Sequence, residues 1–218
     1  MIKSIQDLQE LVDEYGFLPF FENDIKGFSI EEHTHPNLWF NDEIDGPWEW
    51  KSEMIMTKKY VYGKFFNRKA GFISLKWLPH FANVRRDGYD FDSRCDDGLV
   101  YFKDQELYEI IEKTRYITTK ELKKEFNDKS YETIITRLMM QTYIVNTNFV
   151  YHFSKSGERY GWGIAEYGIP EKFLGKKAVR GAYKDDPLKS KEKIIKHIKI
   201  LFPEASEQAI WKIVIKGA

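Results

Sequence analysis

Two histidines separated by a single residue are the first candidates for chemistry in this sequence of 218 residues. His33 and His35 lie in the run EEHTH, and on an extended chain side chains at i and i+2 point to the same side. Two imidazoles and a carboxylate can hold a divalent metal ion such as zinc. Without a third ligand at a recognisable spacing, however, such a pair is more typical of ordinary solvated or hydrogen-bonded histidines. We therefore expect no bound cofactor and keep a metal site as an alternative.

A cluster of aspartates between residues 87 and 97 is the second candidate. The stretch DGYDFDSRCDDG holds five aspartates, and closely spaced carboxylates can bind Mg²⁺ or act in acid–base catalysis. These carboxylates could complete the histidine site of a metal-dependent hydrolase. Their spacing is not that of an EF-hand loop. Three arginines alongside, Arg85, Arg86 and Arg94, favour mutual neutralisation within an ordered loop.

The rest of the sequence holds no recognisable catalytic or phosphate-binding motif. No Gly-rich phosphate loop and no Ser-His-Asp or Cys-His arrangement is apparent. The one cysteine, Cys95, cannot form an internal disulfide, which favours a reducing compartment. The N-terminal residues MIKSIQDLQE are charged and no apolar run approaches the length of a membrane span. We therefore expect a cytoplasmic protein that does not associate with membranes.

Charge is unevenly distributed along the chain, although the total is zero. Residues 1–100 hold 12 lysines and arginines against 18 acidic residues, whereas residues 161–218 hold 12 against 7. Residues 101–160 are nearly balanced, with 10 against 9. A nucleic-acid partner would therefore be attracted mainly by the C-terminal half.

The hydrophobic pattern predicts three helices followed by two strands within residues 101–170. An apolar stripe in KDQELYEIIEK marks the first helix, and Thr118, three residues before Glu121, has the capping-box spacing that starts the second. A third helix is expected over about residues 130–141. Two strands follow in TYIVNTNFVYHF and YGWGIAEY, joined by a turn at KSGE. This order is that of a winged helix, a variant of the helix-turn-helix.

An aromatic-rich α+β part over residues 1–100 precedes this region, and a basic helical tail over residues 171–218 follows it. The predicted fold class is therefore α+β, and the three parts could form one compact domain. The first part should hold a capped helix at about residues 4–15 and a hairpin at 60–74. A short helix with Pro79 in its first turn should follow, whereas residues 17–50 show no clear periodicity. In the tail, the candidate N-caps of two helices are Ser190 and Ser206.

Candidate DNA contacts follow from the predicted winged helix, in which the third helix enters the major groove and the hairpin lies along a neighbouring groove or the backbone. They are Lys129, Ser130, Tyr131, Thr133 and Arg137 on the helix, with Lys155 and Arg159 in the hairpin. Arg68 and Lys69 are added because the aromatic and basic hairpin at 60–74 could stack on bases. Only four of the residues on the third helix and its following hairpin are cationic, and acidic residues lie among them. A winged helix used for packing or protein contacts is therefore an alternative.

A family resemblance is carried by YGKFFNRKAGFIS, LPHFANVRRDGYDFD, DDGL and YGWGIAEYGIPE, together with the winged-helix stretch. These runs resemble a bacterial family related to the AlkZ/YcaQ DNA glycosylases. The resemblance spans most of the chain and implies a winged-helix fold and DNA association. The glycosylases carry a catalytic Gln-x-Gln or Gln-x-Asp pair, and no catalytic residue carries over here. No glutamine of this sequence is followed two positions later by Gln or Asp; the glutamines are Gln6, Gln9, Gln105, Gln141 and Gln208.

The sequence thus favours a winged-helix protein that associates with DNA or with a DNA-processing protein. Two alternatives stay open. One is a metal-dependent hydrolase that uses His33, His35 and the acidic residues 87–97. The other is a module whose aromatic N-terminal half binds a small molecule or a protein, which would require a concave pocket there.

Overall fold

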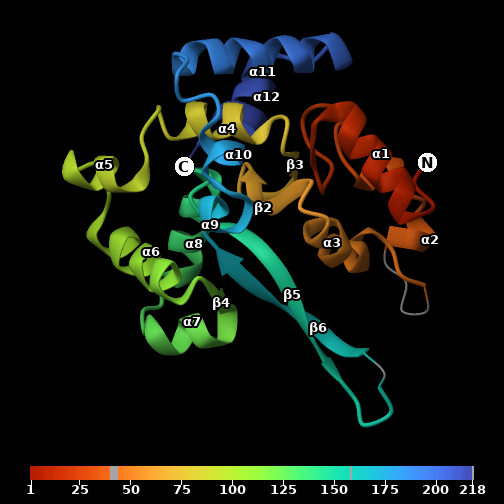
Figure 1. Ribbon diagram of the computed structural model, residues 1–218. Coiled ribbons are helices and arrows are strands. Elements are labelled where there is room, and N and C mark those ends of the chain that lie inside the picture. The colour runs from red at the N-terminus through yellow and green to blue at the C-terminus, as the bar shows by residue number, and fades with distance from the viewer. Residues whose placement is uncertain (40–43, 158, 218) are drawn as a thin grey trace.

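The computed structural model describes residues 1–39, 44–157 and 159–217, and for residues 159, 160 and 162 it describes the backbone alone. The chain is a mixed α+β protein built on one six-stranded antiparallel sheet with strand order β1-β3-β2-β5-β6-β4. Helices surround the sheet, and one long two-stranded hairpin projects away from the body (Figure 1). The predicted α+β class is confirmed.

Helix α1 (Ile5–Tyr15) begins and ends as its sequence predicts. Ser4 and Asp7 form a reciprocal capping box at its start, and Gly16 ends it with a φ of 77°. A Cβ on Gly16 would lie 2.1 Å from Nε1 of Trp77, so only glycine allows the indole to pack against this turn. The short strand β1 (Phe17–Pro19) follows directly and pairs with β3.

Short helices occupy the segment that shows no periodic pattern. A 3₁₀ turn (Glu31–His33) is followed by α2 (Pro36–Trp39) and α3 (Pro47–Met56). Proline at the first position and the Gly46 N–H, which donates to Glu49, start α3. Aromatic contacts rather than an apolar stripe hold this segment, because the rings of Phe20, Phe21, Trp39 and Trp48 pack at centroid distances of 5.0 to 6.3 Å.

Strands β2 (Tyr60–Phe66) and β3 (Lys69–Ser74) form the predicted hairpin. Asn67 and Arg68 occupy its turn with φ of 48° and 65°, the left-handed conformation that matches the twist of two-residue hairpins. Lys64 is the one exposed side chain of β2, and all its other residues are buried. The hairpin therefore presents its cations at one end.

Two helices connect the hairpin to the next part of the chain. Helix α4 (Leu78–Arg85) has Pro79 in its first turn, as predicted. Helix α5 (Phe91–Asp96) lies within the acidic stretch and starts at Asp90, whose carboxylate accepts the N–H of Ser93. The stretch is therefore a short capped helix rather than a loop.

Residues 102–168, which we call the helix–hairpin unit, contain the elements predicted between residues 101 and 170. They are α6 (Phe102–Thr114), β4 (Tyr116–Thr118), α7 (Thr119–Glu125), α8 (Tyr131–Met140), β5 (Val145–Phe153) and β6 (Arg159–Gly168). The capping box of Thr118 and Glu121 is present. Strand β4, which the sequence pattern did not predict, pairs with β6 and closes the unit as a small three-stranded sheet.

The C-terminal segment forms α9 (Pro170–Leu174), α10 (Lys176–Arg180), α11 (Pro187–Leu201), α12 (Glu207–Ile210) and a π-helical turn (Trp211–Ile215). Ser206 caps α12, as predicted. The prediction for Ser190 is wrong: it is buried inside α11, which begins three residues earlier because Asp186 accepts the N–H of Leu188 and a proline follows. Within the described residues, no helix combines the length and apolar character needed to cross a membrane.

Two hydrophobic clusters organise the molecule. The larger joins the N-terminal part to the C-terminal helices, so that Phe17 and Phe72 share a core with Ile198 and Val214. The smaller lies among α6, α7 and α8. The sheet links the two, because the hairpin β2–β3 joins the helix–hairpin unit through the pair Tyr62 and Asn146.

Candidate nucleic-acid interface

The turn of the β2–β3 hairpin lies directly against α8, which brings two separate sets of predicted residues together. The Lys64 N–H points to Sδ of Met139 at 3.5 Å, and the Arg68 N–H to Sδ of Met140 at 3.2 Å. The ammonium of Lys64 also reaches the hydroxyl of Thr136 at 3.4 Å. The hairpin cations and the exposed face of the third helix therefore form one surface.

A basic cleft of about 610 Å³ lies on this surface. Side chains from the β2–β3 hairpin, α5, the start of α6 and α8 line it, chiefly Lys64, Arg68, Arg94, Tyr101, Thr133 and Arg137. Arg68, Thr133 and Arg137 were predicted as DNA contacts. Sequence reasoning missed Lys64 and Arg94, because only the tertiary fold places them beside α8.

The cleft carries net positive charge. Within the described residues, no carboxylate forms an ion pair with Lys64, Arg68 or Arg94. Arg94 donates to the backbone carbonyl of Arg86 at 3.1 Å, which fixes its position but leaves its charge uncompensated. The one acidic side chain in the lining is Glu132, which accepts from the hydroxyl of Tyr131 at 2.5 Å. An anion in this cleft would meet three uncompensated cations.

Arg137 differs from these cations because it is already paired. Its guanidinium makes two hydrogen bonds to the buried carboxylate of Asp104, at 2.6 and 2.5 Å, and lies 4.9 Å from the ring of Tyr101. These bonds to Asp104 raise the pKa of Arg137. Arg137 thus connects α8 to α6, and its positive charge is largely neutralised by the carboxylate of Asp104.

The N-terminal end of α8 holds the other predicted helix contacts. Ser130 donates from its N–H and hydroxyl to Asp128, at 2.7 and 2.6 Å. Hydrogen bonds from Lys103 and from Ser130 lower the pKa of Asp128. Tyr131 is half-buried, whereas Lys129 and Thr133 are exposed. Lys129 and Thr133 are therefore the residues at this end of the helix best placed to meet a partner.

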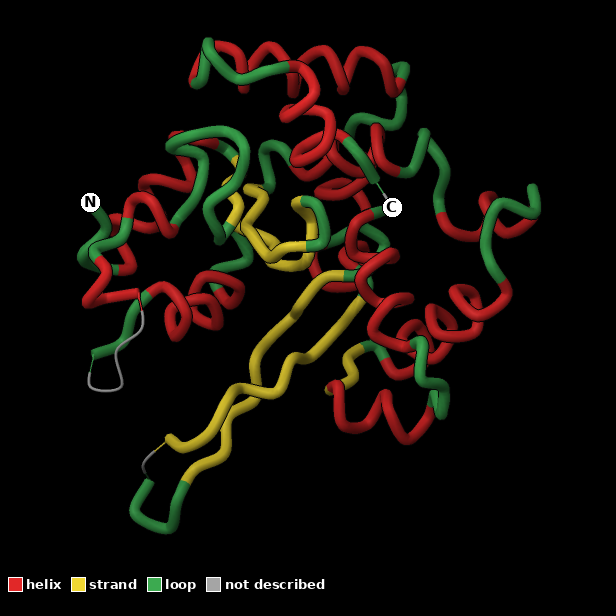
Figure 2. The backbone as a smooth tube through the Cα atoms, turned by 180° about the vertical axis from the view of Figure 1, so that it is seen from behind, coloured by secondary structure: helices red, strands yellow, loops and turns green. Residues whose placement is uncertain are grey.

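The β5–β6 hairpin extends well beyond the body of the protein (Figure 2). Lys155 lies exposed in its turn, and Val150 and Phe153 are exposed on β5. Arg159 begins β6, and its side chain lies outside the described part of the structure. The hairpin thus offers one described cation and an apolar surface near its end.

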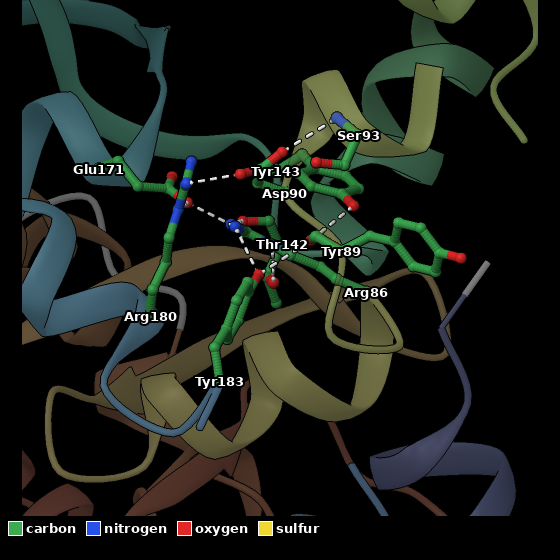
Figure 3. Close-up of polar contacts among 9 residues, drawn as sticks. All are labelled: Arg86, Tyr89, Asp90, Ser93, Thr142, Tyr143, Glu171, Arg180 and Tyr183. Atoms are coloured by element: carbon green, nitrogen blue, oxygen red, sulfur yellow. Dashed lines mark hydrogen bonds and ion pairs between the residues drawn. The ribbon is translucent and has the colours of Figure 1, made fainter. Parts of the chain in front are cut away.

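A buried ion network fixes the C-terminal end of α8 (Figure 3). Arg86 donates to the carbonyl of Thr142 at 2.5 Å, to its hydroxyl at 3.2 Å and to the carboxylate of Glu171 at 2.5 Å. Arg180 donates to the same carboxylate at 3.0 Å and pairs with Asp90. Burial would raise the pKa of Glu171, but the two arginines outweigh it and lower that pKa. The acidic stretch thus contributes to packing through Asp90.

Arg85, the last residue of α4 and the neighbour of Arg86, connects the end of α8 to the C-terminal segment. Its guanidinium donates to the carbonyls of Met140 at 3.1 Å and Val214 at 2.7 Å. The carbonyl of Met140 lies at the end of α8, where helix carbonyls lack intrahelical partners and cations are favoured. Burial lowers the pKa of Arg85 to about 9, so the group stays charged at neutral pH. Two adjacent arginines therefore hold the helix end against the rest of the protein.

The histidines and the acidic stretch are far apart. His33 lies in the 3₁₀ turn, beside Gly27, whose carbonyl is 2.9 Å from its Nε2, and Tyr15. His35 accepts the N–H of Asn37. This segment pairs with residue 2 near the N-terminus, whereas α5 lies on the opposite side of the molecule (Figure 1). Of the residues that the structure describes, no three His, Cys, Asp or Glu side chains gather as a metal site would require.

The basic C-terminal segment also lies away from the basic cleft. Helix α11, which carries five of its eleven lysines, is at the opposite end of the molecule from the tip of the β5–β6 hairpin in both views (Figures 1 and 2). It packs on α4 through buried residues such as Ile194 and Ile198. Three cations of the cleft, Lys64, Arg68 and Arg94, come instead from the N-terminal part, whose net charge is negative.

The fold and the cleft define a mixed α+β protein in which a basic surface adjoins a helix–hairpin unit. A family model described as AlkZ related matches residues 2–215, and the chain belongs to this AlkZ-related family. No curated protein and no solved structure gives a significant match.

Proposed function

We propose that the helix–hairpin unit is a winged helix that associates with DNA, with α8 as the helix that meets the duplex and the β5–β6 hairpin as the wing. The observation that carries this proposal is the basic cleft, whose three uncompensated cations lie immediately beside the exposed face of α8. The order of elements supports it. A winged helix is expected to have a helix, a strand, two helices and a hairpin in this order, and the unit has them. Its single strand β4 pairs with β6, the second strand of the hairpin.

The family supports the same conclusion, since AlkZ proteins are DNA glycosylases and the chain belongs to an AlkZ-related family. Base excision itself is not part of the proposal. Gln141 lines the basic cleft, but the residue two positions further on is Tyr143, whose ring packs against Phe91 and Arg86. The cleft therefore lacks the polar pair that the glycosylases use, and we propose association without excision.

Binding should depend mainly on phosphate contacts. Exposed cations near α8 and the wing include Lys64, Arg68, Lys69, Lys129 and Lys155, and the half-buried Arg94 adds to them. If these residues neutralise about six phosphates, the logarithm of the association constant should fall with the logarithm of salt concentration with a slope of about −5. Such a slope would indicate non-specific or weakly specific binding, since few side chains suited to base edges lie on α8.

The test is a fluorescence-anisotropy titration of a labelled duplex and a labelled single strand at low and high salt. The Lys64→Ala/Arg68→Ala double variant should reduce the magnitude of the salt slope by about 2, because two phosphate contacts are lost. The matched control is Lys189→Ala/Lys196→Ala, which removes the same charge from α11 at the far end. The proposal fails if wild-type binding does not depend on salt, or if both double variants weaken binding equally.

A further inference from the structure

A second cavity, of about 340 Å³, adjoins the basic cleft at the β2–β3 hairpin, because Lys64 and Arg68 line both. It is bounded by that hairpin, by α3 and by the base of the β5–β6 hairpin. Rings form much of its wall, namely those of Phe21, Trp48, Tyr62, Phe149 and Tyr167. We call it the aromatic cavity. Its volume is in the range of small-molecule sites.

The floor of the aromatic cavity is a row of polar side chains across three strands. Tyr62 of β2 pairs with Asn146 of β5, which pairs in turn with Tyr167 of β6. Residues directly opposite each other in antiparallel strands have their side chains on the same face, and all three side chains line the cavity. The row therefore presents a hydroxyl, an amide and a second hydroxyl to whatever occupies the cavity.

Two of these side chains line the cavity without a partner for their polar atoms among the described residues. Tyr62 is 5% exposed and Asn146 is 4% exposed. Neither the phenol of Tyr62 nor the amide of Asn146 makes a hydrogen bond to any residue that the structure describes. Tyr167 differs, since its hydroxyl is 3.3 Å from that of Thr119. Neither group is among the fully enclosed polar atoms that lack a partner, so the amide and the phenol are open to the cavity and available to a ligand.

Cations form the rim. Lys64, Arg68 and Lys69 line the aromatic cavity, and each is exposed. Lys69 lies 5.9 Å from the ring of Phe21, and the described residues supply no carboxylate to any of the three. Behind the wall, the ammonium of the buried Lys51 lies 4.7 Å from the ring of Phe149. The site thus combines stacking faces, an edge of hydrogen-bonding groups and positive charge.

We propose that the aromatic cavity binds a nucleotide. Its base would stack against the rings and pair its edge with Asn146 and Tyr62, and its phosphate would lie at Lys69 and the neighbouring cations. The nucleotide could be free or part of a single strand, since both present the same ring and phosphate. The two sites share Lys64 and Arg68, but each also has a cation of its own by which it can be tested separately. Lys69 lines the aromatic cavity and not the basic cleft, whereas Arg94 lines the basic cleft and not the aromatic cavity.

The experiment is isothermal titration of the full chain with the common mononucleotides, a short oligothymidylate and inorganic phosphate. Saturable binding of a mononucleotide tighter than that of phosphate would identify a free nucleotide as the ligand. Binding of the oligothymidylate alone would identify a nucleotide within a strand. Tyr62→Phe keeps the ring and removes only the hydroxyl, and Asn146→Leu keeps the branched shape while removing the amide. Each should weaken binding by about threefold to tenfold, the effect of one lost hydrogen bond.

Two single variants, one from each cavity, separate this site from the duplex interface. Lys69→Ala should weaken nucleotide binding, and Arg94→Ala should leave it unchanged while weakening duplex binding. Thermal unfolding of each variant shows whether it is folded. The proposal is overturned if phosphate binds as tightly as the nucleotides, if Tyr62→Phe and Asn146→Leu bind like the wild type, or if neither nucleotide form binds. A failure of duplex binding alone would leave this site standing.

Discussion

Replacing Glu171 by glutamine tests the buried ion network that anchors α8. The substitution keeps the size of the side chain and removes the charge that balances Arg86, whose side chain is 0% exposed, and Arg180, which is 29% exposed. Loss of one partner from a buried pair costs about 3–5 kcal/mol. Arg86 keeps its bonds to Thr142 and Tyr183, and Arg180 is partly solvated. We therefore expect the lower end, about 3 kcal/mol.

Urea unfolding as a function of pH measures this effect. The pKa of Glu171 is lowered in the folded protein, so the unfolded chain takes up the proton at the higher pH. The stabilisation is therefore complete above the ordinary glutamate pKa of about 4.3 and is lost as the pH falls further through the folded value. Glu171→Gln should lower the free energy of unfolding by about 3 kcal/mol at pH 7, and the difference from wild type should shrink below about pH 4.

The matched control is Glu112→Gln, which alters a solvent-exposed ion pair. Glu112 and Lys172 lie 3.3 Å apart with side chains 46% and 39% exposed, and such pairs contribute about 0–1 kcal/mol. If Glu171→Gln costs no more than this control, or if its cost is the same at pH 3 and pH 7, the network does not stabilise the fold as described.

Three further substitutions test other parts of the helix–hairpin unit. Arg137→Ala leaves the buried carboxylate of Asp104 unpaired and should lower the free energy of unfolding by about 2–3 kcal/mol. This is less than the cost for a fully buried pair, because Arg137 is 27% exposed. A cost near zero in urea unfolding would show that the pair is not formed in solution. Thr118→Ala removes the capping box of α7 and should lower the free energy of unfolding by about 1 kcal/mol, whereas Thr118→Ser should retain most of the stability. Equal losses for the two variants would exclude a capping effect. Leu138→Ala opens a cavity among α6, α7 and α8 and should cost about 2–5 kcal/mol, whereas unchanged thermal stability would contradict the packing described.

The elements of the helix–hairpin unit could be predicted because local patterns specify them. Thr118 and Glu121 carry their capping signal within four residues, and the apolar positions of α8 recur at helical spacing. The β2–β3 hairpin was equally predictable, from two β-prone runs around a polar turn. By contrast, α3 has almost no amphipathic stripe and is held by rings from distant segments, so no local period marks it.

The basic cleft could be predicted only in part. Arg68 and Arg137 were recognised as basic residues near a turn and on a helix, but nothing local shows that the hairpin turn packs against α8. Lys64 and Arg94 join them from β2 and α5 through tertiary contacts alone. For the same reason the charge distribution along the sequence could not show where the lysine-rich segment lies, since α11 packs on α4 at the end of the molecule opposite the tip of the β5–β6 hairpin. Net charge along a sequence does not locate a charged surface.

The two adjacent arginines of α4 also bear on the order of events during synthesis. The end of α8 is held by Glu171 through Arg86 and by the carbonyl of Val214 through Arg85. Both partners are made after α8, and at ordinary rates of translation residue 214 follows residue 140 by roughly 10 s. A nascent chain therefore carries α8 and its hairpin for that interval before Arg85 can reach the carbonyl of Val214, so this contact with the helix end is completed only after the C-terminal segment has been made.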